Sequence, residues 1–242
     1  MDIGKYTSQD RILLAVDCII FGFDGKEIKA LLIKRGFEPE KGKWSLMGGF
    51  VNKNENVDDA AIRILKQLTG LTDIYMEQLY CFGNTDRDTA GRVVSIAYFA
   101  LINIENYNEQ LTHDHEARWF GLNKIPSLIF DHKQMVNKAK KVLAEKVSNH
   151  PIGFELLPAR FTLQQLQNLY EAIFETPLDK RNFTRKILSI NVLKKLKEKE
   201  KASSRKGAFY YRFDKTTYKK LQIDKIKFIW VWRLSIDFVA NY

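Results

Sequence analysis

The sequence has few of the features that mark secreted, membrane or zinc-binding proteins. Only two of its 242 residues are cysteines, Cys18 and Cys81, and both lie in apolar stretches with strand character. We expect two buried, reduced thiols rather than a disulfide. The four histidines show no zinc-type spacing with cysteine. The sequence therefore predicts no metal site of this kind and no cofactor.

Long hydrophobic segments are also lacking. The first six residues contain no apolar core of the kind that a signal peptide needs. The apolar run 228–239 is too short to span a bilayer, and Arg233 and Asp237 interrupt it. We therefore expect a soluble, cytoplasmic protein that does not bind membranes.

Acidic residues are scarce in the last part of the chain. Residues 1–150 hold 20 Lys and Arg and 20 Asp and Glu, so this part is neutral. The whole chain holds 39 basic and 29 acidic residues, which leaves 19 basic and 9 acidic residues for 151–242. The net charge of +10 therefore lies in that part of the chain. Such asymmetry predicts a neutral, ligand-binding half joined to a half that binds a polyanion.

The segment from Gly49 to Leu71 has the spacing of a known catalytic motif. It resembles the Nudix box, G-x5-E-x7-R-E-U-x-E-E-x-G-U, of hydrolases that cut nucleoside diphosphates linked to another group. The positions that match the motif are Gly49, Glu55, Arg63, Leu65, Gly70 and Leu71. The preceding segment 43–51 looks like the strand and loop that enter the family's helix. The resemblance covers roughly residues 10–125 and implies the Nudix fold.

Three positions that hold glutamate in that family are occupied here by Ile64, Gln67 and Leu68. They share one face of a helix expected over 57–69, with Gly70 as its C-terminal stop. Mg²⁺ requires oxygen ligands, whereas Ile and Leu have none and Gln has only a neutral carbonyl. We therefore expect no hydrolase activity, no catalytic residues and no bound metal.

The remainder of the first half alternates strand-like runs with short loops. Asp24-Gly25 is typical of a hairpin turn, and a basic amphipathic helix is expected over 133–147. Strands are expected over 11–23, 26–35, 74–82, 93–102 and 117–120. Strands mixed with one internal helix predict an α/β/α sandwich around a mixed sheet. The break at 149–153 ends this ligand-binding domain, which we assign to residues 1–148.

The basic half has the pattern of a helix-turn-helix. Thr162 and Asp179 are good N-caps for helices over 162–174 and 180–188. We expect the second helix to bury Phe183, Ile187 and Leu188 and to enter the major groove of DNA with its polar side. Arg can bond guanine and Asn adenine, while Lys and Thr hold phosphate. The expected DNA-contacting residues of this helix are Lys180, Arg181, Asn182, Thr184, Arg185 and Lys186.

The segment 202–213 is typical of a wing, a strand–loop–strand ending. Its tip would present Arg205 and Lys206 beside the flexible Gly207, where they neutralise phosphate or probe the minor groove. The preceding stretch 194–201 mixes lysine with glutamate and is expected to be a helix end or a linker. We assign residues 149–222 to a winged helix-turn-helix domain and 223–242 to a tail of unknown role, which makes the chain α+β.

A degenerate Nudix domain followed by a winged helix resembles the bacterial Nudix-related transcriptional regulators. The segments 161–172 and 177–186 look especially like the C-terminal domain of that group. Its members respond to ADP-ribose-type ligands or to L-arabinose. The resemblance implies a homodimeric repressor on palindromic, double-stranded operator DNA. Loss of the metal carboxylates favours L-arabinose as the effector, because a free pentose has no diphosphate for a metal to bridge.

The effector cleft is expected to combine hydrogen-bonding groups with an aromatic or apolar wall. Candidates from the family's cleft region are Lys34, Arg35, Trp44, Glu55, Arg63, Asn84, Asp86 and Tyr98. Three alternatives stay open. The chain is a sensor of ADP-ribose or a related nucleotide sugar, a hydrolase with substitute ligands among Glu55, Asp58 and Asp59, or a protein whose basic half binds RNA or an acidic partner.

Overall fold

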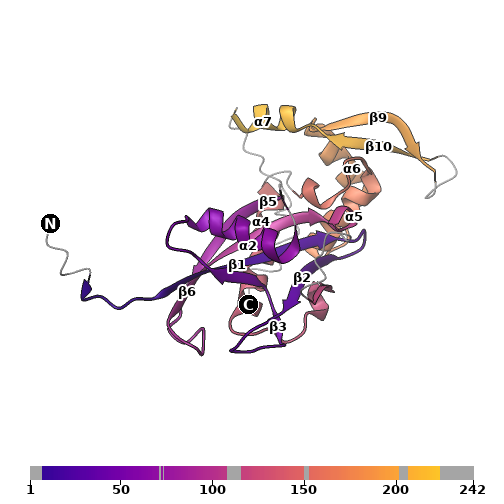
Figure 1. The fold of residues 1–242 in the computed structure, drawn as a ribbon. Coiled ribbons are helices and arrows are strands. Elements are labelled where there is room, and N and C mark those ends of the chain that lie inside the picture. The colour runs from indigo at the N-terminus through magenta and orange to yellow at the C-terminus, as the bar shows by residue number, and fades with distance from the viewer. Residues whose placement is uncertain are drawn as a thin grey trace, which may run out of the picture.

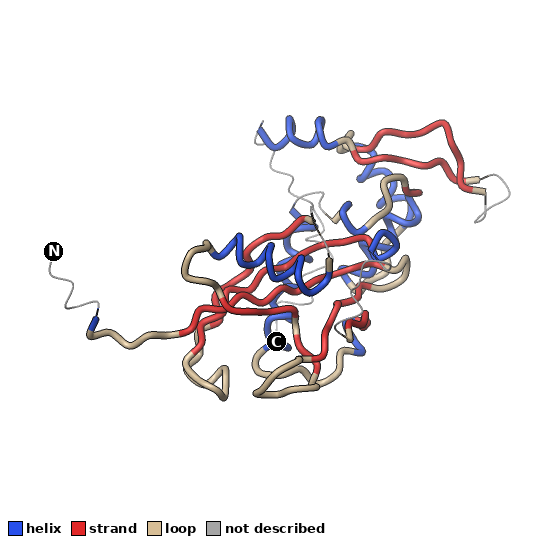
Figure 2. Tube along the Cα trace, in the orientation of Figure 1, coloured by secondary structure: helices blue, strands red, loops and turns tan. Residues whose placement is uncertain are grey.

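The computed structural model describes residues 7–70, 72, 74–107, 116–149, 153–201 and 207–223. A mixed sheet forms the centre of the N-terminal part (Figures 1 and 2). Its strands run in the order β3-β2-β1-β6-β5, with β4 paired to β1 and β7 to β2. Only the pairing of β1 with β6 is parallel among these described strands. The strands are β1 Leu13–Phe23, β2 Ile28–Lys34, β3 Trp44–Ser45, β4 Met47–Phe50, β5 Tyr75–Phe82, β6 Val93–Asn103 and β7 Ala117–Gly121.

Helices cover both faces of this sheet. The helices of the described chain are α2 Val57–Thr69, α3 Ile104–Tyr107, α4 His132–Asn149, α5 Leu163–Phe174, α6 Lys180–Ser189 and α7 Lys215–Ile223, with 3-10 turns η1 Leu122–Lys124 and η2 Phe154–Leu156. In β1, Val16 and Ile20 pack with α2, whereas Ile19 and Phe21 pack in the cluster that contains α4. Alternation along a strand thus supplies two apolar layers from one segment. The expected α/β/α sandwich with a mixed sheet is confirmed.

The C-terminal part is a winged helix. Strands β8 (Phe161–Thr162), β9 (Leu193–Glu200) and β10 (Ala208–Phe213) form a sheet in the order β8-β10-β9. Thr162 and Gln165 form a reciprocal capping box at the start of α5. The Asp179 side chain accepts a hydrogen bond from the backbone N–H of Asn182 and so caps α6. Both helices therefore begin where the sequence predicts.

Three local expectations are wrong. Residues 194–200 lie in β9 rather than in a helix end or linker, because pairing with β10 overrides a weak local pattern. Cys18 is buried, but Cys81 is exposed because it lies on β5, an outer strand of the sheet. Leu188 is 37% exposed, so α6 buries Phe183 and Ile187 without it. The expected wing-tip residues Arg205 and Lys206 and the tail from 224 onward lie outside the described residues.

The two parts of the chain pack against each other through one apolar cluster. Phe21 of β1 and Leu143 of α4 belong to the same cluster as Leu156, Tyr170 and Phe183 of the C-terminal part. In Figure 1 this part, orange to yellow, lies along one end of the sheet. No helix in the described part of the chain is long and apolar enough to cross a bilayer.

Candidate functional site

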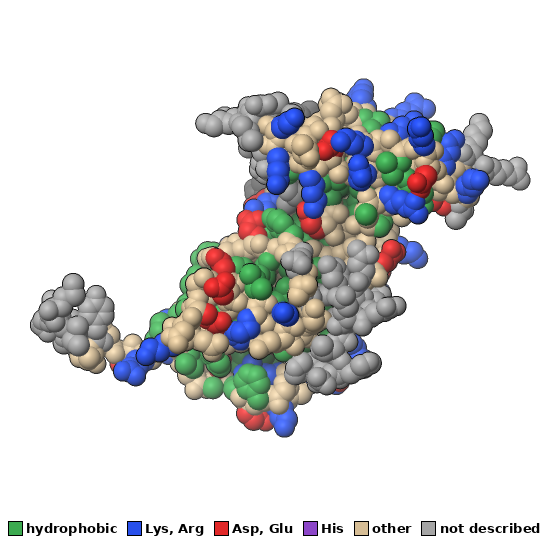
Figure 3. Space-filling model, turned by 45° about the horizontal axis from the view of Figure 1, so that its top comes forward, with side chains coloured by type: hydrophobic (Ala, Val, Ile, Leu, Met, Phe, Trp, Pro, Cys, Tyr) green, Lys and Arg blue, Asp and Glu red, His purple; other side chains and the backbone are tan. Residues whose placement is uncertain are grey.

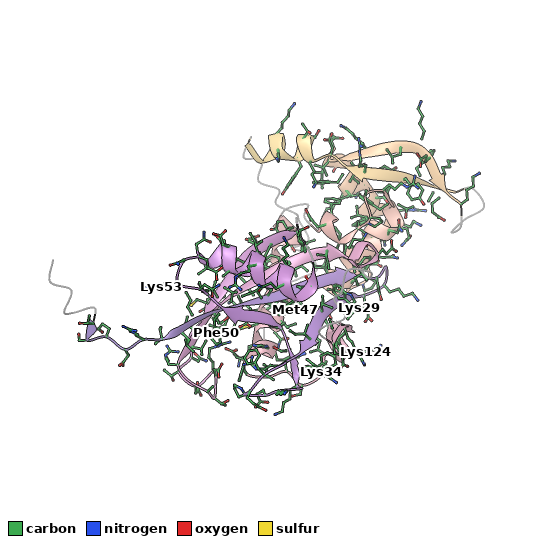
Figure 4. All side chains as sticks on the ribbon, viewed as in Figure 1. Lys29, Lys34, Met47, Phe50, Lys53 and Lys124 are labelled. Atoms are coloured by element: carbon green, nitrogen blue, oxygen red, sulfur yellow. The ribbon has the colours of Figure 1, made fainter. Side chains whose placement is uncertain are left out.

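A cavity of about 120 Å³ opens beside the first half of β1 and the segment from β3 to β4. Its apolar lining includes Phe37, Phe50 and Phe130. Its charged and polar lining includes Asp17, Lys34, Arg35, Arg87, Asp88 and His132. Figure 4 labels Lys34 and Phe50, which come from β2 and β4. Of the expected effector residues, Lys34 and Arg35 lie in this lining.

A buried ion pair forms the floor of the cavity. Arg87 donates from Nε and Nη2 to the two carboxylate oxygens of Asp131, over 3.0 and 2.8 Å. Its Nη2 also lies 3.5 Å from Oδ2 of Asp17, an oxygen that accepts a 2.6 Å hydrogen bond from Ser95. Burial opposes the charged form of Arg87, but the two carboxylates outweigh it and raise the guanidinium pKa. The guanidinium therefore remains charged at neutral pH.

The imidazole of His132 is held neutral beside this pair. Its Nδ1 accepts a 3.1 Å hydrogen bond from the backbone N–H of Leu46, which places the ring proton on Nε2. That Nε2 lies 3.6 Å from Oδ1 of Asp17. Burial lowers the pKa of His132, against the opposing effect of Asp17 and Asp131. With His132 neutral, two carboxylates face one guanidinium, so this buried group has one formal negative charge in excess.

Positive charge and aromatic surface meet at the mouth of the cavity. The guanidinium of Arg35 lies 4.0 Å from the ring centre of Phe37 and 5.4 Å from that of Phe130. Its Nε donates to the carbonyl oxygen of Phe37. Phe37 is 54% exposed, so one ring of this cluster is open to solvent. A planar, anionic ligand would find both a stacking surface and a cation here.

Two expected residues, Glu55 and Arg63, brace the loop before α2 instead of facing the cavity. Arg63 donates from Nε to Glu55 over 2.9 Å and from Nη2 to the carbonyl oxygen of Phe50 over 3.0 Å. The carboxylate also accepts a 2.7 Å hydrogen bond from the backbone N–H of Asn52. The hydrogen bond from Arg63 is the largest cause that lowers the pKa of Glu55 to about 2. Glu55 is thus fixed as an anion in a structural pair.

Two of the three positions that would carry metal-binding glutamates, Ile64 and Leu68, face apolar surroundings, and the third, Gln67, is exposed. Ile64 is buried in the cluster beneath α2, and Leu68 packs against that cluster and lines the cavity. Gln67 accepts a hydrogen bond from Arg63. The nearby carboxylates also have structural partners, since Asp58 accepts from the Tyr98 hydroxyl and Asp59 from the Asn56 amide. Across the residues that the structure describes, no three His, Cys, Asp or Glu are grouped as metal ligands.

The remaining expected residues lie outside the lining of the cavity. Trp44 stands beside it, half-buried, with its ring 4.9 Å from that of Phe120. Asn84 and Asp86 are exposed on the loop after β5. Tyr98 lies under α2, where burial and the bond to Asp58 raise its pKa.

Sequence reasoning missed three polar residues of the cavity floor, Asp17, Arg87 and His132. A carboxylate in the middle of the apolar run 12–23 was the one available signal, because a charge is almost never buried there without a partner.

A second candidate site is the exposed side of α6. Lys180, Arg181, Asn182 and Arg185 are exposed, whereas Thr184 and Lys186 are half-buried. Arg185 donates to the side-chain oxygen of Asn182 over 2.9 Å, so these two groups lie together. Figure 3 shows Lys and Arg side chains gathered over the C-terminal part of the molecule. A short, basic, exposed helix beside a β-hairpin is the geometry of a winged-helix DNA reader.

Comparisons with known proteins match both halves of the chain. Residues 11–145 match the NUDIX domain family, and residues 153–213 match the NrtR DNA-binding winged helix domain. The chain is 35% identical over 205 residues to the ADPR responsive transcriptional repressor NtrR of Acinetobacter baylyi, which covers 83% of this chain and 82% of the relative. It is 37% identical over 136 residues to an ADP-ribose pyrophosphatase of Methanocaldococcus jannaschii, covering 56% of this chain and 77% of the enzyme.

Among solved structures, the fold is similar to that of Shewanella oneidensis NrtR complexed with a 27mer DNA. The TM-score is 0.77 at 28% identity, over 85% of this chain and 95% of that one. A second crystal structure of Shewanella oneidensis NrtR gives a TM-score of 0.74 at 29% identity, over 83% of this chain and 94% of that one. Similarity therefore extends through the N-terminal sheet and the winged helix together.

Proposed function

Because this chain belongs to the NrtR-type, Nudix-related transcriptional regulators, we propose that it is a repressor that binds operator DNA through its winged helix. The observation that carries this proposal is similarity over both halves to a repressor in sequence and to a DNA complex in structure. The exposed basic side of α6 supplies the contact surface. We assign effector sensing to residues 1–148 and DNA binding to 149–222.

We propose that the effector is ADP-ribose or a related nucleotide sugar. The expectation of L-arabinose has no support from the comparisons, whose repressor relative is described as ADPR responsive. The cavity also favours a nucleotide, because Arg35 at its mouth offers a positive charge that attracts a diphosphate and has no counterpart in a free pentose, whereas Lys34 and Arg87 already pair with carboxylates. Phe37 and Phe130 offer ring surfaces on which a base can stack.

The proposed activity is binding without hydrolysis. Ile64 and Leu68 present no lone pair to a metal, and Glu55, Asp58 and Asp59 are each bonded within the protein. Incubation with ADP-ribose and Mg²⁺, followed by chromatography for AMP, tests this point. Turnover that scales with enzyme concentration would restore the hydrolase alternative.

Helix α4 is the element best placed to carry the signal from effector to DNA. It begins at His132, in the cavity floor, next to the Asp131 that holds Arg87. Further along, Lys140 makes a 2.7 Å ion pair with Glu175, the residue that ends α5. An effector whose phosphates attract the Arg87 guanidinium weakens the hydrogen bonds between Arg87 and Asp131. Because Asp131 directly precedes α4, this change acts on the start of that helix. Coupling between two such sites is typically about 1–3 kcal/mol, or roughly 5- to 150-fold in affinity.

A fluorescence anisotropy titration on DNA from upstream of the protein's own operon tests the proposal. We expect tight, salt-sensitive binding that ADP-ribose weakens and that equal concentrations of AMP or L-arabinose leave unchanged. Arg181→Ala and Arg185→Ala should each lose specific binding, since both side chains are exposed on α6. Normal operator binding in both variants would remove α6 as the reader. Release by L-arabinose and not by ADP-ribose would overturn the effector assignment.

We also propose that the protein binds DNA as a homodimer. A helix-turn-helix dimer reads two half-sites about 34–36 Å apart, so its operator should be palindromic with that spacing. Light scattering coupled to size exclusion measures the stoichiometry directly. Two chains per duplex is the expected result, and one chain per operator-length duplex would contradict it.

A further inference from the structure

The floor of the cavity carries more negative than positive charge. Asp17 and Asp131 face the single guanidinium of Arg87, and the side chains of all three residues are at most 9% exposed. In the part of the chain that the structure describes, no other lysine or arginine forms an ion pair with either carboxylate. Excess charge is costly where water is excluded, so this buried group favours a further positive charge.

The other charged groups that line the cavity do not supply that charge. Lys34 makes a 2.7 Å ion pair with Glu116. Arg35 lies at the mouth of the cavity, over an exposed aromatic ring. Asp88 adds a further carboxylate to the lining. The balancing charge therefore has to come from a group that already lies in the floor.

The imidazole of His132 is placed to become that charge. Its Nε2 lies 3.6 Å from Oδ1 of Asp17, and its Nδ1 lies 3.5 Å from Oγ of Ser45. In the neutral ring, Nδ1 accepts a hydrogen bond from the backbone N–H of Leu46. A protonated Nδ1 can donate to Ser45 instead, while the N–H of Leu46 turns away. The charged ring then lies against Asp17 and balances the floor.

In the free protein, burial keeps this proton away. Burial is the largest influence on the pKa of His132 and lowers it from 6.5. Asp17 and Asp131 act in the opposite direction, whereas Arg87 and Arg35 lower the same pKa further. A change in the charge of the cavity therefore decides whether the ring is neutral or charged.

An anionic ligand makes such a change. Asp17, Arg87 and His132 all line the cavity, so a bound diphosphate lies close to each of them. Its negative charge competes with Asp17 for the guanidinium and favours a positive ring. Ile64 and Leu68 offer no oxygen ligand through which a metal ion could supply positive charge instead.

We propose that an anionic ligand that binds in the cavity takes up one proton from solvent at His132, which becomes an imidazolium between Asp17 and Ser45. This inference rests on the proposed binding of ADP-ribose and adds to it a dependence on pH. Ligand and proton each raise the affinity for the other, because the two binding events are linked. Affinity for the ligand should therefore rise as pH falls, by at most about tenfold per pH unit.

Isothermal titration calorimetry of the full-length protein with ADP-ribose, in MOPS and in Tris at the same pH, tests the proposal. The diphosphate of ADP-ribose is fully ionised near neutral pH, so any proton that the buffer exchanges goes to or comes from the protein. We expect proton uptake of up to one per bound ligand, and an affinity that rises as pH is lowered from about 8 to about 6. Equal heats in the two buffers, with a constant affinity over this range, would overturn proton uptake.

Two carboxylate variants form a matched pair. D17N removes the excess charge and the partner of the imidazolium, while Arg87 keeps its bonds to Asp131. This variant should give equal heats in both buffers and an affinity that does not depend on pH. D86N removes an exposed carboxylate outside the cavity lining and should take up the proton as the wild type does. An equal loss of uptake in both variants would show general electrostatics and overturn the assignment to the floor.

Nuclear magnetic resonance of the wild-type protein locates the proton directly. The imidazole signal that disappears in H132N belongs to His132. Addition of ADP-ribose near neutral pH should move this signal toward the value of a protonated ring. Proton uptake that leaves the signal unchanged would place the proton on another group and overturn the proposal. Absence of any binding heat for ADP-ribose would instead refute the proposed effector, and thermal melting confirms that each variant is folded.

Discussion

Removal of Arg87 should cost more stability than removal of any exposed arginine in the same loop. Its side chain is 3% exposed and lies between Asp131 and Asp17. The substitution Arg87→Met keeps much of the volume but leaves two buried carboxylates without their cation. Breaking a buried ion pair in this way costs about 3–5 kcal/mol. At about 2–4 °C per kcal/mol for a chain of this size, the melting temperature should fall by roughly 6–20 °C.

Differential scanning calorimetry of Arg87→Met, beside the matched variant Arg92→Met, measures this cost. Arg92 is exposed and donates only to backbone carbonyls, so its loss should shift the melting temperature by about 4 °C or less. Adding Asp131→Asn to Arg87→Met removes one orphaned charge and should recover part of the loss. Equal shifts in the two single variants, or no recovery in the double variant, would refute the buried-pair reasoning. The same variants should bind ADP-ribose more weakly if Arg87 contacts the effector.

Three further predictions concern pH and capping. Burial lowers the pKa of His132 from 6.5, so the unfolded chain takes up this proton first and the free energy of unfolding should fall as pH drops below about 6.5. In His132→Asn, the urea concentration at the midpoint of unfolding should depend less on pH below about 6.5 than in the wild type. The same pH dependence in both proteins would contradict a buried, neutral ring. The pKa of Glu55 is lowered to about 2, so its stabilising pair is present above about 4.5 and lost as pH falls toward 2. Glu55→Gln should therefore be less acid-sensitive than the wild type in circular dichroism melts. Thr162→Ala breaks the capping box and should lower stability by about 1 kcal/mol in urea unfolding, with Thr162→Ser close to wild type.

Many helices and strands of this fold are specified by residues that are close together in the sequence, so their positions could be predicted. The alternation of β1 identifies a strand with two apolar faces, and Gly70 adopts φ 72 as the left-handed cap that ends α2. Thr162 and Asp179 cap their helices through residues three positions away. Each of these signals lies within a single turn or strand, so no tertiary information is needed to find it.

The cavity floor could not be predicted, because its residues come together only through tertiary structure. Arg87 reaches Asp131 across 44 positions and Asp17 across 70. No spacing rule links a residue of a central strand, one of a surface loop and one at the start of a helix. The same limit explains β9, whose strand character depends on pairing with β10 rather than on its own lysine-rich sequence.

The motif before and within α2 divides into residues that shape the loop and residues that would serve a metal. Gly49 gives the loop room against α2, because a Cβ there would lie 2.9 Å from Cδ1 of Ile64 and that side chain would have to shift. Glu55 and Arg63 tie the loop to the helix through hydrogen bonds that need no ligand. Substitution of the metal-binding positions by Ile64 and Leu68 leaves all of these contacts in place. The contacts that shape this loop therefore do not depend on the metal-binding carboxylates, so spacing in this motif predicts the fold, whereas only its carboxylates predict catalysis.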